Sequence, residues 1–362
     1  MRNLGEIKVY PLLFFIVLIS FQSAWGQLVQ RDSLPFNTGQ SPPSIFKTLA
    51  NDKVEKLTIE TDIKALLKGK SKTDPEYQAA FLSFNDENDH LQEWEMKIRV
   101  RGKRRKEYCS FPPVKIKFRK AELEELGFAR DFNDLKIVTH CTSHLKSEDY
   151  VMREYLIYKM YNLLTNYSFR VKLIEIEYID TKQKVKPIKA VAFIIENTDE
   201  MASRIGGIIY EEPTFRLSFV KNEATAVQDV FQYMIGNTDY KINAYHNIKM
   251  IKKKDAFLLF PVPYDFDYSG LVNTSYSTPA VGIKSESVRE RFFLGYCIPE
   301  LKGETVFSIF MEQKEAMFSL IDDFEFLHLR SKKFMKKYLG SFFSVIRSKS
   351  ARRYKIINKC IK

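Results

Sequence analysis

Two neighbouring segments of this chain alternate apolar and charged residues along their whole length. In residues 94–101 every even position is apolar and every odd position is Glu, Lys or Arg, and residues 114–119 repeat the pattern with Lys and Arg alone. A period of two places successive side chains on opposite faces of a β-strand. The basic segment 103–106 lies between the two runs. We therefore predict an antiparallel hairpin with one buried face and one basic face.

Other apolar runs predict further strands and helices. Strands are expected at 54–61, 79–85, 135–138, 172–179, 190–196 and 248–251. Helices are expected from residue 148 to about 163, and at 224–235, 287–291, 304–320 and 327–346. Because strands dominate the first half and helices the second, we predict an α+β chain, with a strand-rich N-terminal lobe at 51–197 and a helical C-terminal lobe at 198–362.

The first 26 residues have the features of a cleaved secretory signal. Arg2 and Lys8 precede an apolar run at 11–21, which is followed by the small-residue pattern Ala24-Trp25-Gly26. The run is too short to span a bilayer, although a short membrane anchor is the alternative. Residues 27–50 then predict an exposed linker. We expect a secreted or periplasmic protein with no transmembrane span after cleavage.

The four cysteines do not predict a zinc site, because no C-x-x-C pair or adjacent Cys/His pair occurs among them. An oxidising compartment permits one or two disulfides. Cys109 and Cys141 flank predicted neighbouring strands and are the preferred pair, with buried free thiols as the alternative.

The composition favours an anionic partner. The chain has 57 Lys and Arg residues against 45 Asp and Glu, a formal net charge of +12. Such an excess suits phosphates, nucleic acids, acidic polysaccharides or membrane surfaces without choosing among them. We predict no specific nucleic-acid partner.

Two polar segments in the second half of the chain could carry chemistry. The first runs from Gly236 past Asp239 to Asn247, which opens a strand, and the second, after a return strand, contains Asp265 and Asp267. In an extended backbone two carboxylates two residues apart point to the same face. Carboxylate and amide oxygens suit Mg²⁺, although each segment taken alone is more typical of a turn than of a ligand set. Their order matches the catalytic and metal-binding loops of kinases.

From about residue 54 to residue 270 the chain resembles the CotH spore-coat kinase-like family and, more distantly, HipA-type kinases. The matching segments are Arg101-Gly102 with its basic turn, 114–118, Arg153-Glu154, 193–196, 236–239, His246-Asn247 and 264–267. The resemblance implies a two-lobed atypical protein-kinase-like fold that binds ATP with Mg²⁺. It also implies transfer of the γ-phosphoryl group to a hydroxyl group of a protein acceptor.

The resemblance further implies roles for particular residues in the second half. Asp239 would orient or deprotonate the acceptor hydroxyl. Asn247 and Asp265 would hold Mg²⁺ against the nucleotide phosphates, and Asp267 would be a second metal contact. The gap between Asp239 and Asn247 is longer than in ordinary kinases, and Asn243 competes for the metal role.

The remaining implied roles belong to the first half of the chain. Lys117, or its same-face neighbour Lys115, would neutralise the α and β phosphates, and Arg101 with the basic turn would cover them. Glu154 would pair with the phosphate-binding lysine. Glu196 would close its strand at the hinge between the lobes. No glycine-rich phosphate loop of the G-x-G-x-x-G kind occurs.

Three functional hypotheses follow. The leading one is a secreted CotH-like kinase that transfers the γ-phosphoryl group of ATP to a protein hydroxyl with Mg²⁺. The second is a catalytically inactive module of the same family that binds partners at the cell surface. The third is a metal-dependent phosphodiesterase or nuclease that uses the same carboxylates with the basic surface.

Overall fold

The structure is a computed structural model that describes residues 42–49, 55–85, 89–142, 145–254 and 256–362. The predicted signal segment and most of the predicted linker therefore lie outside the described residues. All the described residues belong to one unit, residues 36–362.

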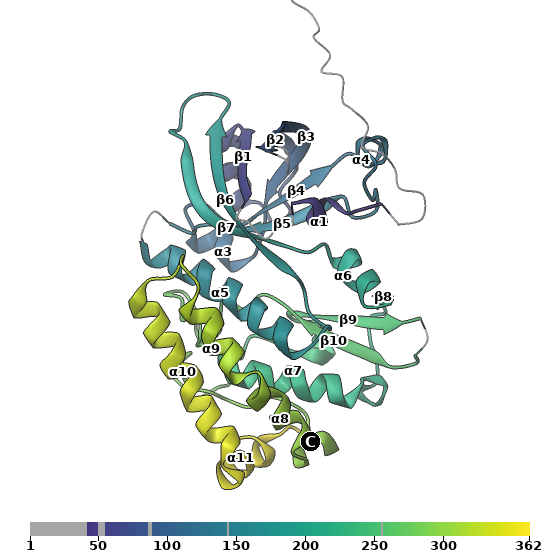
Figure 1. Ribbon diagram of the computed structural model, residues 1–362, viewed down its shortest axis with the longest axis vertical. Coiled ribbons are helices and arrows are strands. Elements are labelled where there is room, and N and C mark those ends of the chain that lie inside the picture. The colour runs from purple at the N-terminus through teal and green to yellow at the C-terminus, as the bar shows by residue number, and fades with distance from the viewer. Residues whose placement is uncertain (1–41, 50–54, 86–88, 143–144, 255) are drawn as a thin grey trace, which may run out of the picture. The chain divides into compact units, whose positions relative to one another are not determined.

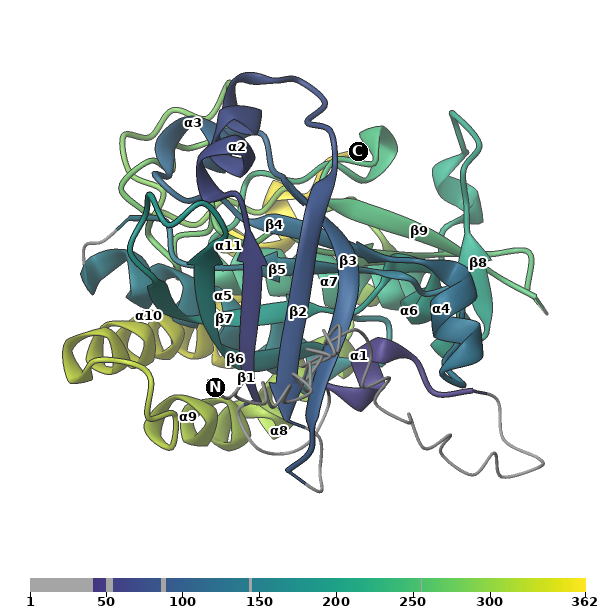
Figure 2. The ribbon, with the colours of Figure 1, turned by 90° about the horizontal axis from the view of Figure 1, so that it is seen from above.

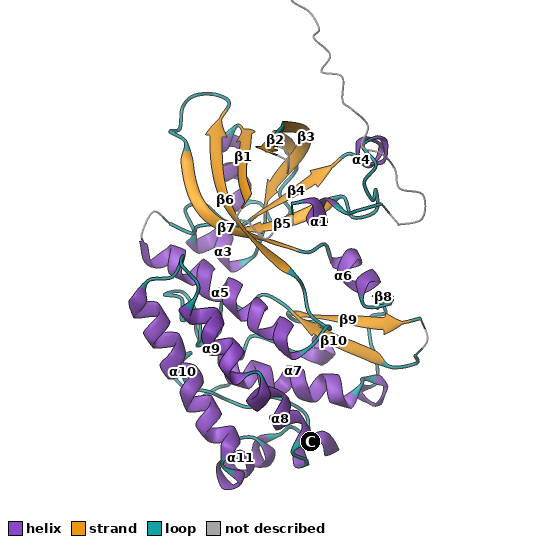
Figure 3. Ribbon diagram, in the orientation of Figure 1, coloured by secondary structure: helices purple, strands orange, loops and turns teal. Residues whose placement is uncertain are grey.

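Seven strands close into a mixed barrel in the order β1-β2-β3-β4-β5-β7-β6 (Figures 1 and 3). Neighbours pair antiparallel except β6 and β1, whose parallel pairing closes the barrel. Figure 2 shows β1, β2 and β3 side by side along one wall. The strands are β1 Glu55–Thr61, β2 Gln78–Asn85, β3 Leu91–Val100, β4 Val114–Phe118, β5 Asp134–Val138, β6 Val171–Asp180 and β7 Ile188–Ile195.

The alternating sequence pattern explains how β3 and β4 sit in the barrel. Ile98 lies opposite Ile116 in the antiparallel pairing, and both are buried inside. The charged residues between the apolar ones face outward. The predicted hairpin is confirmed, and the expected basic turn contains a short helix, α3 Arg104–Tyr108.

The predicted two-lobed, atypical protein-kinase-like fold is wrong. The strand-rich half closes into a seven-stranded barrel, and a separate three-stranded sheet, ordered β10-β9-β8, lies in the half expected to be helical. The physical reason is that alternation predicts where strands are but not which distant strands pair. The closing partners β1 and β6 pair Glu55 with Ile174 and Thr61 with Asp180, more than a hundred residues apart. Closure leaves no sheet edge exposed in the barrel.

The small sheet lies beside the helices of the C-terminal part (Figure 1), and its buried residues belong to two apolar clusters, one of which it shares with those helices. Its strands are β8 Gly207–Ile209, β9 Ile248–Lys253 and β10 Leu259–Pro263. The longer helices are α5 Leu145–Leu164, α7 Asn222–Ile235, α8 Thr305–Glu312, α9 Lys314–Asp322 and α10 Leu329–Arg347. The shorter helices are α1 Ile45–Thr48, α2 Ile63–Lys68, α4 Lys120–Glu125, α6 Thr198–Arg204 and α11 Lys349–Lys355.

The helix predictions were mostly confirmed, with two differences. The run at 304–320 breaks at Gln313 into α8 and α9. The segment 287–291 is irregular rather than helical. In the part of the chain that the structure describes, no helix is both long and apolar enough to cross a membrane.

Two disulfides join distant segments. Cys109 is bonded to Cys141, which confirms the preferred pair. Cys297 is bonded to Cys360, a pairing that the sequence did not indicate. The first disulfide joins the end of α3 to the segment between β5 and α5.

Candidate functional site

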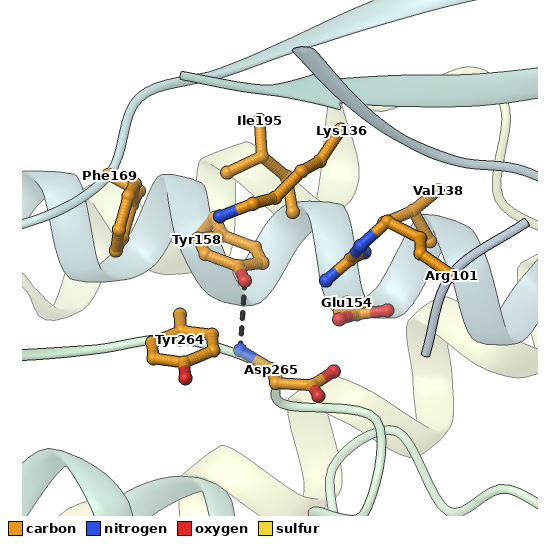
Figure 4. A pocket seen from close by; sticks show the side chains of 9 residues that line it. All are labelled: Arg101, Lys136, Val138, Glu154, Tyr158, Phe169, Ile195, Tyr264 and Asp265. Atoms are coloured by element: carbon orange, nitrogen blue, oxygen red, sulfur yellow. Dashed lines mark hydrogen bonds between the residues drawn. The ribbon is translucent and has the colours of Figure 1, made fainter. Parts of the chain in front are cut away.

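A small pocket lies between the barrel, α5 and the segment after β10 (Figure 4). It is partly open to solvent. Its polar side chains come from elements far apart in sequence. The lining residues are Arg101, Lys136, Val138, Glu154, Tyr158, Phe169, Ile195, Tyr264 and Asp265.

Lys136 is the lysine that reaches into this pocket. On β5 the neighbours Leu135 and Ile137 are buried in the barrel, so the alternation turns Lys136 outward toward α5. Its Nζ donates to Oγ1 of Thr198 at 3.0 Å. Burial lowers the pKa of Lys136 to about 7, and the nearby charge of Arg101 acts in the same direction. A buried lysine with few anionic neighbours is suited to an anionic ligand.

The predicted phosphate-binding lysines do not reach the pocket. Lys117 is exposed on the outer face of the barrel. Lys115 lies on that face too, and its Nζ is 3.0 Å from the Asp134 carboxylate. Both lysines point out of the barrel, as predicted, but they lie on β4, and it is β5 that passes over the pocket. Sequence alternation alone could not distinguish the two strands.

Glu196 also lies outside the pocket. Its carboxylate accepts hydrogen bonds from Nε and Nη2 of Arg204, at 2.7 and 2.9 Å, and from the Arg170 main-chain N–H at 2.9 Å. Glu196 is almost fully buried. These contacts tie the end of β7 to α6 and the start of β6, which is a structural role.

Arg101 and Arg105 follow β3 and turn back over α5. Gly102 has a φ of 88°, a left-handed conformation that glycine adopts without strain. Arg101 lines the pocket. The Arg105 guanidinium forms ion pairs with the carboxylates of Glu154, on α5, and Asp267, the latter at 3.0 Å. The predicted pairing of Glu154 with a lysine is therefore replaced by pairing with Arg105.

This buried cluster holds opposite charges in an apolar setting. Burial raises the pKa of Glu154, and Arg105 opposes that rise. Burial also acts against the charge of Arg105, but Glu154, Tyr276 and Asp267 together raise its pKa well above the ordinary value. Tyr276 donates a further hydrogen bond to Asp267 at 3.0 Å. Both contacts go to Oδ2 of Asp267.

The loop after α7 presents Asp239. The helix ends at Gly236, with a φ of 65°, and Oδ1 of Asn237 then accepts the main-chain N–H of Asp239 at 3.0 Å. Nδ2 of Asn247 donates to the main-chain oxygen of Asp239 at 2.7 Å and to its Oδ2 at 3.0 Å. Nε2 of His246 lies 2.8 Å from Oδ1. Asp239 is therefore held in place but remains partly exposed.

Asp265 stands beside Asp239 at the end of the β9–β10 hairpin. Its φ is 64°, and its main-chain N–H donates to the Tyr158 hydroxyl at 2.9 Å (Figure 4). The main-chain N–H of Tyr264 donates to the Asn247 carbonyl at 3.0 Å. Burial raises the pKa of Asp265, as do the nearby charges of Asp267 and Asp239. The structure thus brings Asp239, Asn247 and Asp265 together.

The residues present fit a magnesium ion that is shared with phosphates, but not a cage made of protein ligands alone. Among the described residues, no group of three His, Cys, Asp or Glu side chains is arranged to hold a metal. Two side chains remain suitable, Asp265 with its carboxylate and Asn247 with its amide oxygen. Nδ2 of Asn247 faces Asp239, so the amide oxygen of Asn247 is not used in that contact. Mg²⁺ commonly uses one or two protein ligands plus phosphate and water. Asn243 is exposed on the 3-10 helix Ile242–Ala244.

Sequence reasoning missed Lys136, Arg105 and Tyr158. Lys136 alternates with buried residues on β5, but Lys115 and Lys117 do the same on β4, so the pattern does not single out Lys136. Arg105 was noted only as part of a basic turn, and nothing in the sequence places it against Glu154. Tyr158 is an apolar-face residue of a helix, and its hydroxyl contact with Asp265 depends on tertiary packing.

No protein-family model matches this chain, and no curated protein is significantly similar to it.

Proposed function

We propose that the protein binds Mg²⁺–ATP at this pocket and transfers the γ-phosphoryl group to a hydroxyl group of a protein acceptor. The observation that carries the proposal is the position of Arg101 and Lys136 on one side of the pocket and Asp265 on the other (Figure 4). Phosphoryl transfer needs fixed cations for the phosphates and carboxylates for the metal and the acceptor. The order of the CotH-like sequence segments supports the same reaction.

The protein's own side chains would divide the work between phosphate and acceptor. Lys136 and Arg101 would neutralise phosphate oxygens, because they are the cations that line the pocket. A carboxylate oxygen of Asp239 would accept the proton of the acceptor hydroxyl. The hydroxyl oxygen then bonds to the γ phosphorus while the bond to the β–γ bridging oxygen breaks, which leaves ADP.

Two residues would hold the metal. Asp265 and the side-chain oxygen of Asn247 are the available oxygen ligands on the acidic side. A bound Mg²⁺ would neutralise charge on the phosphate oxygens.

The disulfides support an extracellular or periplasmic location for this activity. Such bonds form and persist mainly in oxidising compartments. Cys109 directly follows α3 and is bonded to Cys141, so the same environment would preserve the position of α3.

Phosphoryl transfer from radiolabelled Mg²⁺–ATP to protein acceptors tests the proposal. Wild-type protein should transfer label, and Asp239→Asn should lose at least about 100-fold of the rate. Stabilisation of the wild type by Mg²⁺–ATP without any transfer would indicate an inactive binding module instead. Cleavage of a phosphodiester without a requirement for ATP, abolished by Asp265→Asn, would indicate the hydrolase.

A further inference from the structure

Two glycines bring the loops of Asp239 and Asp265 into direct main-chain contact. The N–H of Gly270 donates to the carbonyl of Gly236 at 3.0 Å, and the N–H of Leu271 donates to the carbonyl of Ile235 at 2.9 Å. Gly236 lies three residues before Asp239, and Gly270 lies five residues after Asp265. The relative position of the two carboxylates therefore depends on this junction.

The hydroxyl of Tyr338, on α10, fills the junction. A Cβ atom on Gly236 would lie 2.0 Å from the Tyr338 hydroxyl oxygen, and one on Gly270 would lie 2.5 Å from it. Both glycines thus pack directly against the same atom. The hydroxyl is buried, and no described residue forms a hydrogen bond with it. A buried unpaired hydroxyl is destabilising, so stability alone does not account for a tyrosine here.

Arg291 fixes Tyr338 to the end of α7. Its guanidinium carbon lies 3.8 Å from the centroid of the Tyr338 ring, and Nη2 donates to the Tyr338 carbonyl at 2.7 Å. Its Nε donates to the carbonyl of Met234 at 3.0 Å, in the last turn of α7. The last carbonyls of a helix lack partners within the helix. One side chain therefore joins α10 to the turn that leads into Gly236.

We infer that Arg291 and Tyr338 are positioning residues for the proposed phosphoryl transfer. They act through Gly236 and Gly270, which set the separation of the Asp239 and Asp265 loops. The inference rests on the proposed function, since it is that reaction whose geometry they hold. A displacement of about 1 Å can cost roughly 100-fold in rate.

The neighbouring arginine provides a matched control. Arg289 is exposed, and its guanidinium carbon lies 5.3 Å from the Phe334 ring centroid. Its main chain packs against Gly270, and a side-chain substitution leaves that contact in place. We expect Arg291→Gln to lower kcat for phosphoryl transfer by about 10- to 100-fold, with KM for ATP changed by less than about 2-fold. Arg289→Gln should change neither. Arg291→Lys keeps the charge but not the forked hydrogen bonds, so its kcat should be intermediate.

Hydrogen exchange gives a readout that does not depend on activity. In Arg291→Gln, the amides of Gly270 and Leu271 should exchange at least about 10-fold faster than in the wild type, because their opening is local. If Arg291→Gln does not fold, Arg291→Lys is measured in the same way. Unchanged exchange at these amides, or an unchanged kcat in an active enzyme, would overturn the inference. A wild type without transfer activity would reject the proposed function. The exchange measurement would still show whether Arg291 holds the contact between the Gly236 and Gly270 main chains.

Discussion

The side chain of Asn247 donates two hydrogen bonds to Asp239, one to its main-chain oxygen at 2.7 Å and one to its carboxylate at 3.0 Å. The contact joins the loop after α7 to the start of β9. It also orients the Asn247 amide so that its nitrogen faces Asp239. In our proposal the amide oxygen would be the atom that binds the metal ion.

Replacement of Asn247 and of Asn243 should show which asparagine contributes to the site. Asn247→Ala removes both hydrogen bonds and an oxygen ligand, so we expect at least about a 100-fold loss of kcat/KM for phosphoryl transfer. Asn243→Ala, at an exposed position, should stay within about 2-fold. Steady-state kinetics at several Mg²⁺ concentrations would measure both. Equal losses in the two variants would contradict the assignment.

Lys136→Met should abolish binding of ATP but stabilise the free protein. The folded pKa of Lys136, about 7, lies below its ordinary value of 10.5. Between pH 7 and pH 10.5 the folded state therefore binds fewer protons than the unfolded state, so the free energy of unfolding increases with pH. Below about pH 7 the charged, buried lysine destabilises the folded state by its full amount. Stability returns as pH rises toward 10.5.

We expect Lys136→Met to raise Tm by at least about 2 °C at pH 6.5, with a smaller gain at pH 10. Differential scanning calorimetry at both pH values measures the change. Lys117→Met, on the exposed face of the barrel, is the control and should leave Tm unchanged. A gain that is the same at both pH values would show that Lys136 is not titrating as described.

Arg105 should contribute far more to stability than its neighbour on α3. Arg105→Gln leaves Glu154 and Asp267 buried without their cation, a change that typically costs about 3–5 kcal/mol. Arg104 forms an exposed pair with Glu107, so Arg104→Gln should leave the unfolding midpoint unchanged. Urea unfolding of both variants measures the difference. Similar midpoints would contradict the buried ion-pair cluster.

The two disulfides should affect stability alike but nucleotide binding differently. Loops closed over 32 and 63 residues predict a loss of about 4 kcal/mol for either bond when both cysteines are replaced by serine. Cys109 directly follows α3, so loss of its bond should also weaken Mg²⁺–ATP binding. The Cys297→Ser/Cys360→Ser variant should retain binding. If the two double variants bound Mg²⁺–ATP equally well, the position of α3 would not affect the pocket, which would contradict this prediction.

Local sequence patterns predicted the elements of this fold better than their arrangement. The alternation in β3 and β4 was sufficient because one face of each strand is buried. The parallel pairing of β6 with β1 was not predictable, since it joins residues more than a hundred positions apart. The expected two-lobed kinase-like fold was wrong for this reason, because it supplied an arrangement that the individual strands do not specify.

The candidate site divides in the same way. Asp239, Asn247 and Asp265 were predictable because they flank one short hairpin. Lys136 was not distinguished from Lys115 and Lys117, because the choice depends on which strand passes over the pocket.

The most direct test is calorimetric titration of the wild-type protein, Lys136→Met and Asp265→Asn with ATP, each with and without Mg²⁺. We predict one site in the wild type that requires Mg²⁺, and a loss of at least about 100-fold in affinity in both variants. Absence of binding by the wild type, or binding that survives both substitutions unchanged, would contradict a nucleotide site between Lys136 and Asp265.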